Sequence, residues 1–206
     1  MVEFRGAGPA EFAGRLDTVM AIYQAAMSPP PDQVDGRKGI MHNHAAYPRF
    51  QCYLAELRES PVMRPGAVEV TDDRAEPAPR IVGFAYGFHG TPGQWWHDVV
   101  YRAVAERSGT QEADAWLGDA FELAEIHVHP DFQGRGIGRA MIETLCAGRA
   151  ERSALLSTHD RPTAARHLYG ALGFTDLLSA YVFPGGHEQY AIVGRPLPLP
   201  RTPSAP

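Results

Sequence analysis

The sequence predicts an α/β fold in which a mixed β-sheet carries helices on both faces. Three observations support this prediction. Segments of strand-like composition and segments of helical spacing follow one another without strict alternation. The 206 residues are 44% hydrophobic, which is enough to bury one sizeable core, and they contain no internal repeat. We therefore expect one domain over residues 1–195, followed by a proline-rich, disordered tail over 196–206.

The N-terminal part is predicted to contain one strand and two helices. Residues 2–5 are short and extended in character, which favours a first strand. Over 10–27 the apolar residues recur at steps of three and four, and the prolines at 29–31 end this helix. A second helix is expected around residues 50–57, where four large apolar residues have a similar spacing.

The middle of the chain is predicted to form a hairpin followed by a long insertion. Residues 67–70 and 80–88 are expected to be paired strands joined by a polar turn. The segment 90–119 is unusually long for a connection in a compact domain, and it contains a predicted helix around 99–106. Trp95 and Trp96 lie in this insertion, where they would either wall a substrate site or pack against the sheet.

The remaining elements surround a glycine-rich segment. Strand composition, helical spacing and turn residues each predict part of this region. The predicted elements are a strand over 123–128, a helix that begins near Ile137, a strand over 154–157, a helix over 165–172 ended by Gly173, and a closing hairpin with arms at 177–183 and 190–193.

Composition excludes several classes of protein. The formal charge of −5 and the pI near 6.0 lack the basic character of a nucleic-acid-binding protein. No apolar stretch approaches the length of a membrane span and no signal peptide is present, so we expect a cytoplasmic protein without membrane partners. Cys52 and Cys146 are expected to be free thiols. Lys38 is the only lysine among 19 basic residues, which is typical of a GC-rich bacterial genome.

The segment from Gln133 to Arg139 predicts a phosphate-binding turn. Its glycines allow a tight turn between a strand and a helix, and they leave backbone N–H groups free to face an anion at the helix N-terminus. The spacing does not fit a dinucleotide-binding fingerprint, since Arg139 stands where the third glycine would be. The segment lacks the lysine that a Walker loop requires.

The order Gln133, Arg135, Gly136 and Gly138 resembles the pyrophosphate loop of the GCN5-related N-acetyltransferase (GNAT) family. The resemblance extends upstream to residues 126–130 and downstream to the Leu-Gly-Phe sequence that ends at residue 174, so that it covers about 121–174. One departure is Pro162, which stands where many family members carry an asparagine that contacts the cofactor.

This resemblance implies a fold, a reaction and a cofactor site. It implies a mixed, mostly antiparallel sheet with splayed fourth and fifth strands. It also implies transfer of an acetyl group from acetyl-CoA to a primary amine, by direct attack in a ternary complex. The acceptor would be a small metabolite, a protein lysine or a protein N-terminus. The cofactor-binding residues carried over from the family are Ile126, His127, Val128, Gln133, Gly134, Arg135, Gly136, Ile137, Gly138 and Arg139.

The resemblance also implies catalytic candidates. Tyr169 stands at the position of the family's general acid, where it would protonate the departing thiolate, and backbone N–H groups near Val128 would stabilise the developing oxyanion. Glu122 and Glu125 are alternative general bases. Strand alternation directs these two carboxylates to opposite faces unless a bulge intervenes, and His127 shares the Glu125 face.

Other interpretations remain open at this point. The runner-up is a catalytically inactive acyl-CoA-binding sensor or regulatory module. The pairs His42 with His44 and His127 with His129 lack carboxylate or cysteine partners at a metal-binding spacing, so we predict no metal site. A homodimer is left open, and no motif identifies the acceptor amine.

Overall fold

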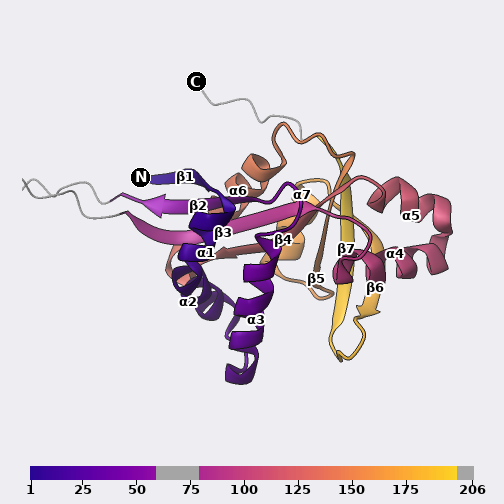
Figure 1. Cartoon of the computed structure of the whole chain (residues 1–206), viewed down its shortest axis with the longest axis horizontal. Coiled ribbons are helices and arrows are strands. Elements are labelled where there is room, and N and C mark those ends of the chain that lie inside the picture. Colours follow the sequence, from indigo (N-terminus) through magenta and orange to yellow (C-terminus); the bar gives the residue numbers. More distant parts are fainter. Residues whose placement is uncertain (59–78, 199–206) are drawn as a thin grey trace, which may run out of the picture.

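A computed structural model describes residues 1–58 and 79–198 of the chain. Its seven strands form one sheet in the order β1-β2-β3-β4-β5-β7-β6, shown in Figure 1. Every neighbouring pair is antiparallel except β4 and β5, which are parallel. This mixed, mostly antiparallel sheet confirms the predicted fold class. The strands are β1 (Val2–Ala7), β2 (Gln51–Leu57), β3 (Arg80–His89), β4 (Ala120–Val128), β5 (Ser153–His159), β6 (Thr175–Val182) and β7 (Gln189–Pro196).

The helix expected around residues 50–57 is wrong, because this segment is strand β2. Its spacing fits a helix and a strand equally well, and the strand wins because β2 lies between β1 and β3 in the sheet. Cys52 and Leu54 are fully buried on one side of β2. The predicted strand 67–70 and most of the turn after it lie outside the described residues. Within those residues, β3 pairs with β2 and β4.

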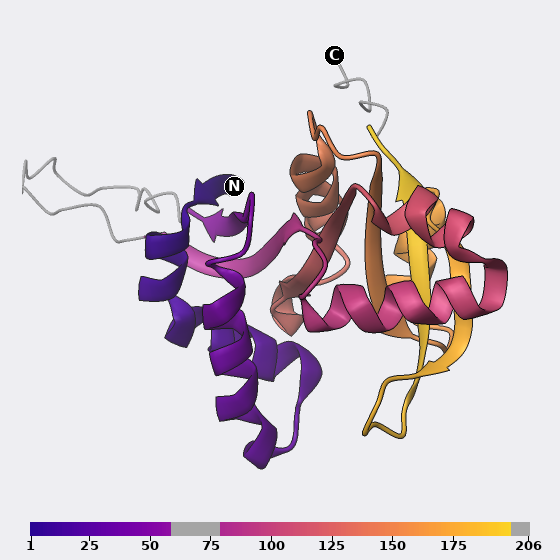
Figure 2. The same cartoon turned by 45° about the vertical axis from the view of Figure 1, so that its right-hand side comes forward.

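Three helices near the N-terminus cover one face of the sheet, at the left of Figures 1 and 2. The helix predicted over 10–27 is interrupted at Arg15 and forms two helices. The prolines that end it also start a helix that sequence spacing did not reveal, since Met41 is its only fully buried side chain. These helices are α1 (Pro9–Gly14), α2 (Leu16–Met27) and α3 (Pro31–His44).

The long insertion between β3 and β4 forms two helices, α4 (Trp95–Ser108) and α5 (Thr110–Leu117), so the predicted helix around 99–106 is confirmed and extended. Leu155 of β5 packs with α4 and α5, whereas its neighbour Leu156 packs with the helices after β4. Consecutive strand residues face opposite sides of a sheet, so helices cover both faces. The helices on the second face are α6 (Ile137–Cys146) and α7 (Ala164–Ala171).

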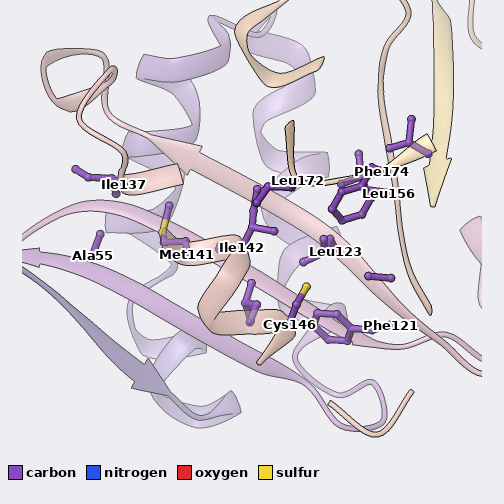
Figure 3. Packing of buried hydrophobic residues seen from close by; sticks show 14 of the residues in the cluster. Ala55, Phe121, Leu123, Ile137, Met141, Ile142, Cys146, Leu156, Leu172 and Phe174 are labelled. Carbon is purple, nitrogen blue, oxygen red and sulfur yellow. The ribbon is translucent and has the colours of Figure 1, made fainter. Parts of the chain in front are cut away.

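Helix α6 packs its apolar side onto the middle of the sheet. Met141 and Ile142 are fully buried there, and Figure 3 shows them in one cluster with Ala55 of β2 and Leu123 of β4. This contact fixes where α6 begins, and therefore where the glycine-rich turn before it lies. Helix α7 ends as predicted, because Gly173 follows it with a φ of +80°.

Strands β4 and β5 separate after a short paired segment. Their ladder contains three residue pairs, and the last of these joins Glu122 to Leu155. The rest of β5 pairs with β7, while the rest of β4 pairs with β3. The splayed fourth and fifth strands are therefore confirmed, and we call the point of separation after Glu122 the fork.

A bulge lies in β4 directly after the fork. Tyr86 and Gly87 are consecutive on β3, but they pair with Glu125 and Leu123, so Ala124 is an extra residue on β4. Gly87 is required opposite the bulge, because a Cβ atom there would lie 2.3 Å from the backbone oxygen of Glu122. Close approach of the two backbones thus determines the position of Glu122.

A buried ion pair fixes the start of β5. Arg149 donates two hydrogen bonds to Glu151, at 2.9 and 2.7 Å, and a third to the Gln51 side chain of β2 at 2.9 Å. Burial alone would raise the pKa of Glu151, but the hydrogen bonds and charge of Arg149 lower it to about 2. The pair stays charged at neutral pH and joins the segment before β5 to β2.

The C-terminal hairpin is confirmed, with β6 and β7 as its arms. Strand β7 extends to Pro196, and most of the predicted tail lies outside the described residues. Within residues 1–58 and 79–198, no helix combines the length and apolar character that a membrane span requires.

Candidate active site

The glycine-rich turn joins β4 to α6 through a single 3-10 turn, η1 (Pro130–Phe132). Gly134 and Gly136 have φ values of +73° and +77°, a conformation that favours glycine. No atom lies within 4 Å of the place where a Cβ would stand on either residue. The turn therefore presents bare backbone to open space directly before the helix.

Contacts within the turn hold it in this shape. Arg135 donates to the carbonyl oxygen of Asp131 at 2.9 Å, and its guanidinium lies 5.1 Å from the centre of the Phe132 ring. The N–H of Ala140 bonds to the carbonyl oxygen of Gly136 at 3.0 Å. The N–H groups of residues 137–139 precede this bond and point out of the helix N-terminus, where an anion would be stabilised.

The free edge of β4 continues from this turn to the fork. The N–H of His129 bonds to the carbonyl oxygen of Val82 on β3 at 2.9 Å. Alternation along an antiparallel strand then directs the backbone groups of Val128 and Ile126 away from β3, toward the gap left by β5. The side chain of Gln133 donates to the Val128 carbonyl at 3.0 Å. Ile126, Val128 and the turn from Gln133 to Arg139 therefore follow one another along this edge, whereas the backbone of His127 faces β3 and its side chain contacts Glu125.

The bulge places both candidate bases on the same face of the sheet. Glu122 pairs with Phe88 and Glu125 pairs with Tyr86, and these two aromatic residues face α1–α3. His127 lies on this face too, opposite Phe84. Simple alternation would have separated the two carboxylates, and the extra residue Ala124 is the reason that it does not.

Glu122 is a buried carboxyl group at the fork itself. Its exposed fraction is 6%, and within the described residues its Oε2 atom is buried without a hydrogen-bond partner. Burial raises the pKa of Glu122 to about 8. An acid of this strength gains and loses its proton near neutral pH, as general acid–base catalysis requires.

Glu125 has the opposite electrostatic environment. Its two oxygens lie 2.5 Å from Nε2 of His127 and 3.1 Å from the Arg37 guanidinium of α3. Burial alone would raise the pKa of Glu125, but the hydrogen bond to His127 and the charges of His127 and Arg37 lower it. Tyr23 of α2 completes the group, with its ring 5.1 Å from His127 and 5.7 Å from the Arg37 guanidinium.

A second layer supports this group from α3. Nδ1 of His44 lies 3.0 Å from the hydroxyl of Tyr86, which is fully buried beside Glu125. Burial lowers the pKa of His44 to about 4 and raises that of Tyr86 well above its usual value. Both side chains are therefore neutral near pH 7, and Glu125 keeps its negative charge beside His127 and Arg37.

Tyr169 reaches the same region from the other face of the sheet. It lies on α7, packs on the α6 side of the core, and its ring is 5.8 Å from Phe174. Burial raises the pKa of Tyr169 to about 12, and the charge of Glu125 adds to this increase. The hydroxyl is therefore protonated at neutral pH, while the candidate bases lie on the opposite side of the sheet.

Comparisons with known proteins agree on one family. The model of the acetyltransferase (GNAT) domain matches residues 80–176. A GCN5-like protein acetyltransferase of Mycobacterium tuberculosis is 34% identical over 204 residues, which cover 93% of this chain and 96% of that protein. The chain belongs to the GNAT family of acetyltransferases. The predicted family and the prediction of an enzyme of the acyltransferase class are confirmed.

Solved structures show the same fold for this GNAT protein. The ribosomal-protein-S18-alanine N-acetyltransferase of Escherichia coli superposes with a TM-score of 0.57 at 18% identity, covering 100% of this chain and 99% of that chain. NAA60 of Arabidopsis thaliana, solved in complex with acetyl-CoA, gives 0.60 at 15% identity, covering 96% and 99%. At these identities the likeness concerns the fold alone.

The two tryptophans of the insertion have different environments in the GNAT protein. Trp96 is partly buried and donates from its indole nitrogen to the Ser157 hydroxyl of β5 at 3.3 Å. Trp95 is 57% exposed and lies 5.6 Å, between ring centres, from Phe183. Trp96 therefore packs against the sheet, whereas Trp95 has an exposed ring that a ligand could contact.

The residues around Pro162 are engaged within the GNAT protein itself. The Asp160 carboxylate accepts the N–H of Ala180 at 2.7 Å, and Thr163 caps α7 by accepting from the N–H of Arg166. Ala180 has a φ of +51°, so the Asp160 bond holds a bend in β6. The departure from the family's asparagine thus accompanies a link between the end of β5 and the closing hairpin.

Sequence reasoning missed the partners that α2 and α3 supply. Arg37 and Tyr23 approach β4 from segments remote in sequence, and no motif marks them. His44 and His127, each a member of a predicted non-metal pair, bond to Tyr86 and Glu125. Within the described residues, no three potential metal-binding side chains gather in one place.

Proposed function

We propose that this acetyltransferase moves an acetyl group from acetyl-CoA to a primary amine of a protein, by direct attack in a ternary complex. The observation that carries the proposal is the buried Glu122 carboxyl at the fork, with Tyr169 packed on the other face of the sheet. The M. tuberculosis relative is named a protein acetyltransferase. Its sequence is 34% identical to this chain over 204 residues, and this similarity favours a protein acceptor over a small metabolite.

The cofactor site would be built from backbone groups. The N–H groups of residues 134–139 would hold the pyrophosphate, because they are exposed at a helix N-terminus. The free backbone edge at Ile126 and Val128 would pair with the pantetheine arm, which places the thioester at the fork. An N–H of this edge would also stabilise the oxyanion that develops on the acetyl group. The acetyl-CoA complex of Arabidopsis NAA60, which has the same fold, supports this choice of ligand.

The two carboxylates would have separate roles. Glu122, with a pKa of about 8, would accept a proton from the attacking amine. Glu125 stays ionised through His127 and Arg37, so it would orient His127 and hold positive charge near the amine. Environments that separate the pKa values of two neighbouring acids are a common sign of such a division.

In the proposed chemical step, the acetyl group moves from the sulfur of CoA to the amine nitrogen. The amine nitrogen forms a bond to the acetyl carbon while the bond from that carbon to sulfur breaks. The amine proton passes to Glu122, and Tyr169 donates its proton to the departing thiolate. Solvent restores both groups. Glu122 would act only as the base and Tyr169 only as the acid, because the two side chains approach the reacting atoms from opposite faces of the sheet.

A turnover assay tests this proposal. The enzyme is mixed with acetyl-CoA, a thiol reagent, and either lysine-containing peptides or small polyamines. We expect release of free thiol with peptides, together with a mass gain of one acetyl group on the peptide. Calorimetry with CoA is measured in parallel. Tight CoA binding without thiol release on any amine would contradict the proposal and favour the sensor.

A further inference from the structure

A row of aromatic rings joins the end of β5 to the closing hairpin and to α4. The ring of Trp95 on α4 lies 5.6 Å from Phe183, at the turn of the closing hairpin. Phe183 lies 5.3 Å from Tyr190 on β7, and Tyr190 stacks on His159 of β5 at 5.0 Å. We call these four residues the aromatic strip.

The strip begins on the face that carries the candidate bases. Leu155 pairs with Glu122 at the fork, and Ser157 and His159 follow it at two-residue steps on the same face of β5. Trp96, the neighbour of Trp95, bonds to Ser157. The strip therefore continues outward from the β5 side of the fork, toward the hairpin.

A partly buried tyrosine and an acidic side chain form the inner end of the strip. The pKa of Tyr190 is raised by burial first and by Glu188 second, and the charge of Arg37 acts on it in the opposite direction. Glu188 also fixes the end of the strip, since its carboxylate accepts from the Tyr190 hydroxyl at 3.2 Å and lies 3.4 Å from His159. These two contacts hold Tyr190 and His159 in place at the inner end of the strip.

The outer end of the strip is exposed. Trp95 has 57% of its surface exposed, more than any other tryptophan, tyrosine or phenylalanine that the structure describes. Large apolar residues that remain exposed next to a reaction centre commonly mark a recognition surface. Rigid aromatic side chains also contribute strongly to binding, because little conformational freedom is lost when they are covered.

We propose that the aromatic strip recognises the acceptor protein by covering a large apolar or aromatic side chain next to the residue that is acetylated. This inference rests on the proposed function, and it specifies the acceptor further. An isolated small amine would occupy the fork without reaching Trp95. A polypeptide continues away from its amine, and an apolar side chain one residue along has the chemistry to cover the exposed rings.

Two six-residue peptides test the inference. The apolar peptide places phenylalanine beside both its free N-terminus and its single lysine, and the glycine peptide replaces these phenylalanines by glycine. Binding to the enzyme saturated with CoA is measured by calorimetry, and KM is measured with acetyl-CoA. We expect the apolar peptide to bind at least about fivefold more tightly, and Trp95→Ala to reduce this ratio toward one. Trp95→Phe should retain most of the ratio.

A matched control is Ile40→Ala, which removes an apolar side chain of similar exposure (45%) from α3, outside the strip. It should leave the ratio between the peptides as in the wild type. Equal affinity of the wild type for both peptides overturns the inference, as does a ratio that survives Trp95→Ala. A wild-type dimer in sedimentation that Trp95→Ala dissociates also overturns it, because the strip would then be a contact between two copies.

The two proposals fail in different ways. If the apolar peptide binds preferentially but no thiol is released, the result supports recognition by the aromatic strip and contradicts acetyl transfer to proteins. If both peptides are acetylated with equal KM, acetyl transfer stands and the strip is not the recognition surface. Calorimetry provides the first comparison without any turnover.

Discussion

The glycine-rich turn and the acid–base group beside the fork lie at opposite ends of the same stretch of β4, yet they are built differently. The turn offers backbone N–H groups in open space, and two of its glycines have positive φ values. The group at Glu125 consists of buried side chains whose charges oppose one another. Binding at the turn should therefore depend on backbone shape and be insensitive to pH, whereas chemistry at the fork should depend on single side chains and on protonation.

The largest expected effect concerns Glu122. We expect Glu122→Gln to lower kcat by about a hundredfold to a thousandfold, because it removes the proton acceptor and keeps the shape. Wild-type kcat/KM should rise as pH increases through about 8, where Glu122 loses its proton, and the variant should lack this part of the profile. If Glu125 is the base instead, Glu125→Gln will lose turnover and Glu122→Gln will keep most of it.

Stability gives an independent check on the same residue. The folded chain holds the Glu122 proton up to about pH 8, whereas the unfolded chain releases it near 4.5, so Glu122 costs stability progressively as pH rises between these values. Glu122→Gln has no such cost. The thermal midpoint of the variant should therefore rise relative to that of the wild type as pH increases from about 5 to about 9. A constant difference would show that the Glu122 pKa is ordinary.

Tyr169→Phe should have the next largest effect. Removing only the hydroxyl should slow turnover by about a hundredfold, the lower end for general acid catalysis, because a thiolate is already a fair leaving group. The dissociation constant of acetyl-CoA should change little. Tyr101→Phe, whose hydroxyl bonds to Asp114 on the α4–α5 pair, is the matched control and should retain full turnover. Full activity of Tyr169→Phe would remove Tyr169 from the mechanism.

Gly136→Asp tests the other end of β4. Gly136 has a φ of +77°, which glycine adopts more easily than aspartate does, so the substitution strains the turn. The negative charge of the new side chain would also repel a phosphate. We expect acetyl-CoA affinity to fall at least about tenfold, or about 1.4 kcal/mol. Gly148→Asp carries the same charge at a φ of +66° beyond α6, so it reproduces the strain without touching the turn. Equal affinities of the two variants would disprove the loop assignment.

The smallest effect is expected for Arg37→Met. Removing this cation should raise the pKa of Glu125, so that kcat/KM falls about threefold near neutral pH and further toward pH 6. Lys38→Met removes the adjacent cation, which pairs with Asp17 at 2.6 Å instead, and should follow the wild-type profile. Identical profiles of the two variants would show that Arg37 has no influence on the chemistry.

What the sequence could predict follows the same division. The glycine-rich turn consists of seven consecutive residues, and its glycines are visible as such, so its place between β4 and α6 was predictable. Arg37 meets Glu125 across 88 residues of chain, and α3 buries so few apolar residues that its spacing gave no sign of a helix. Strand β2 was mistaken for a helix because its apolar residues satisfy both periods, and only its neighbours in the sheet decide between them.

The extra residue Ala124 has a consequence for how relatives are aligned with this chain. Glu122 precedes Gln133 by eleven positions in the sequence, but one of these positions is the bulge and takes up no rung of the β3–β4 ladder. In a relative without the bulge, the residue in the same place would stand ten positions before the loop. An alignment that allows no gap here would match Glu122 with a neighbour that faces the opposite side of the sheet. Equivalent residues of this strand are therefore found by counting residue pairs with β3, and not by counting sequence positions.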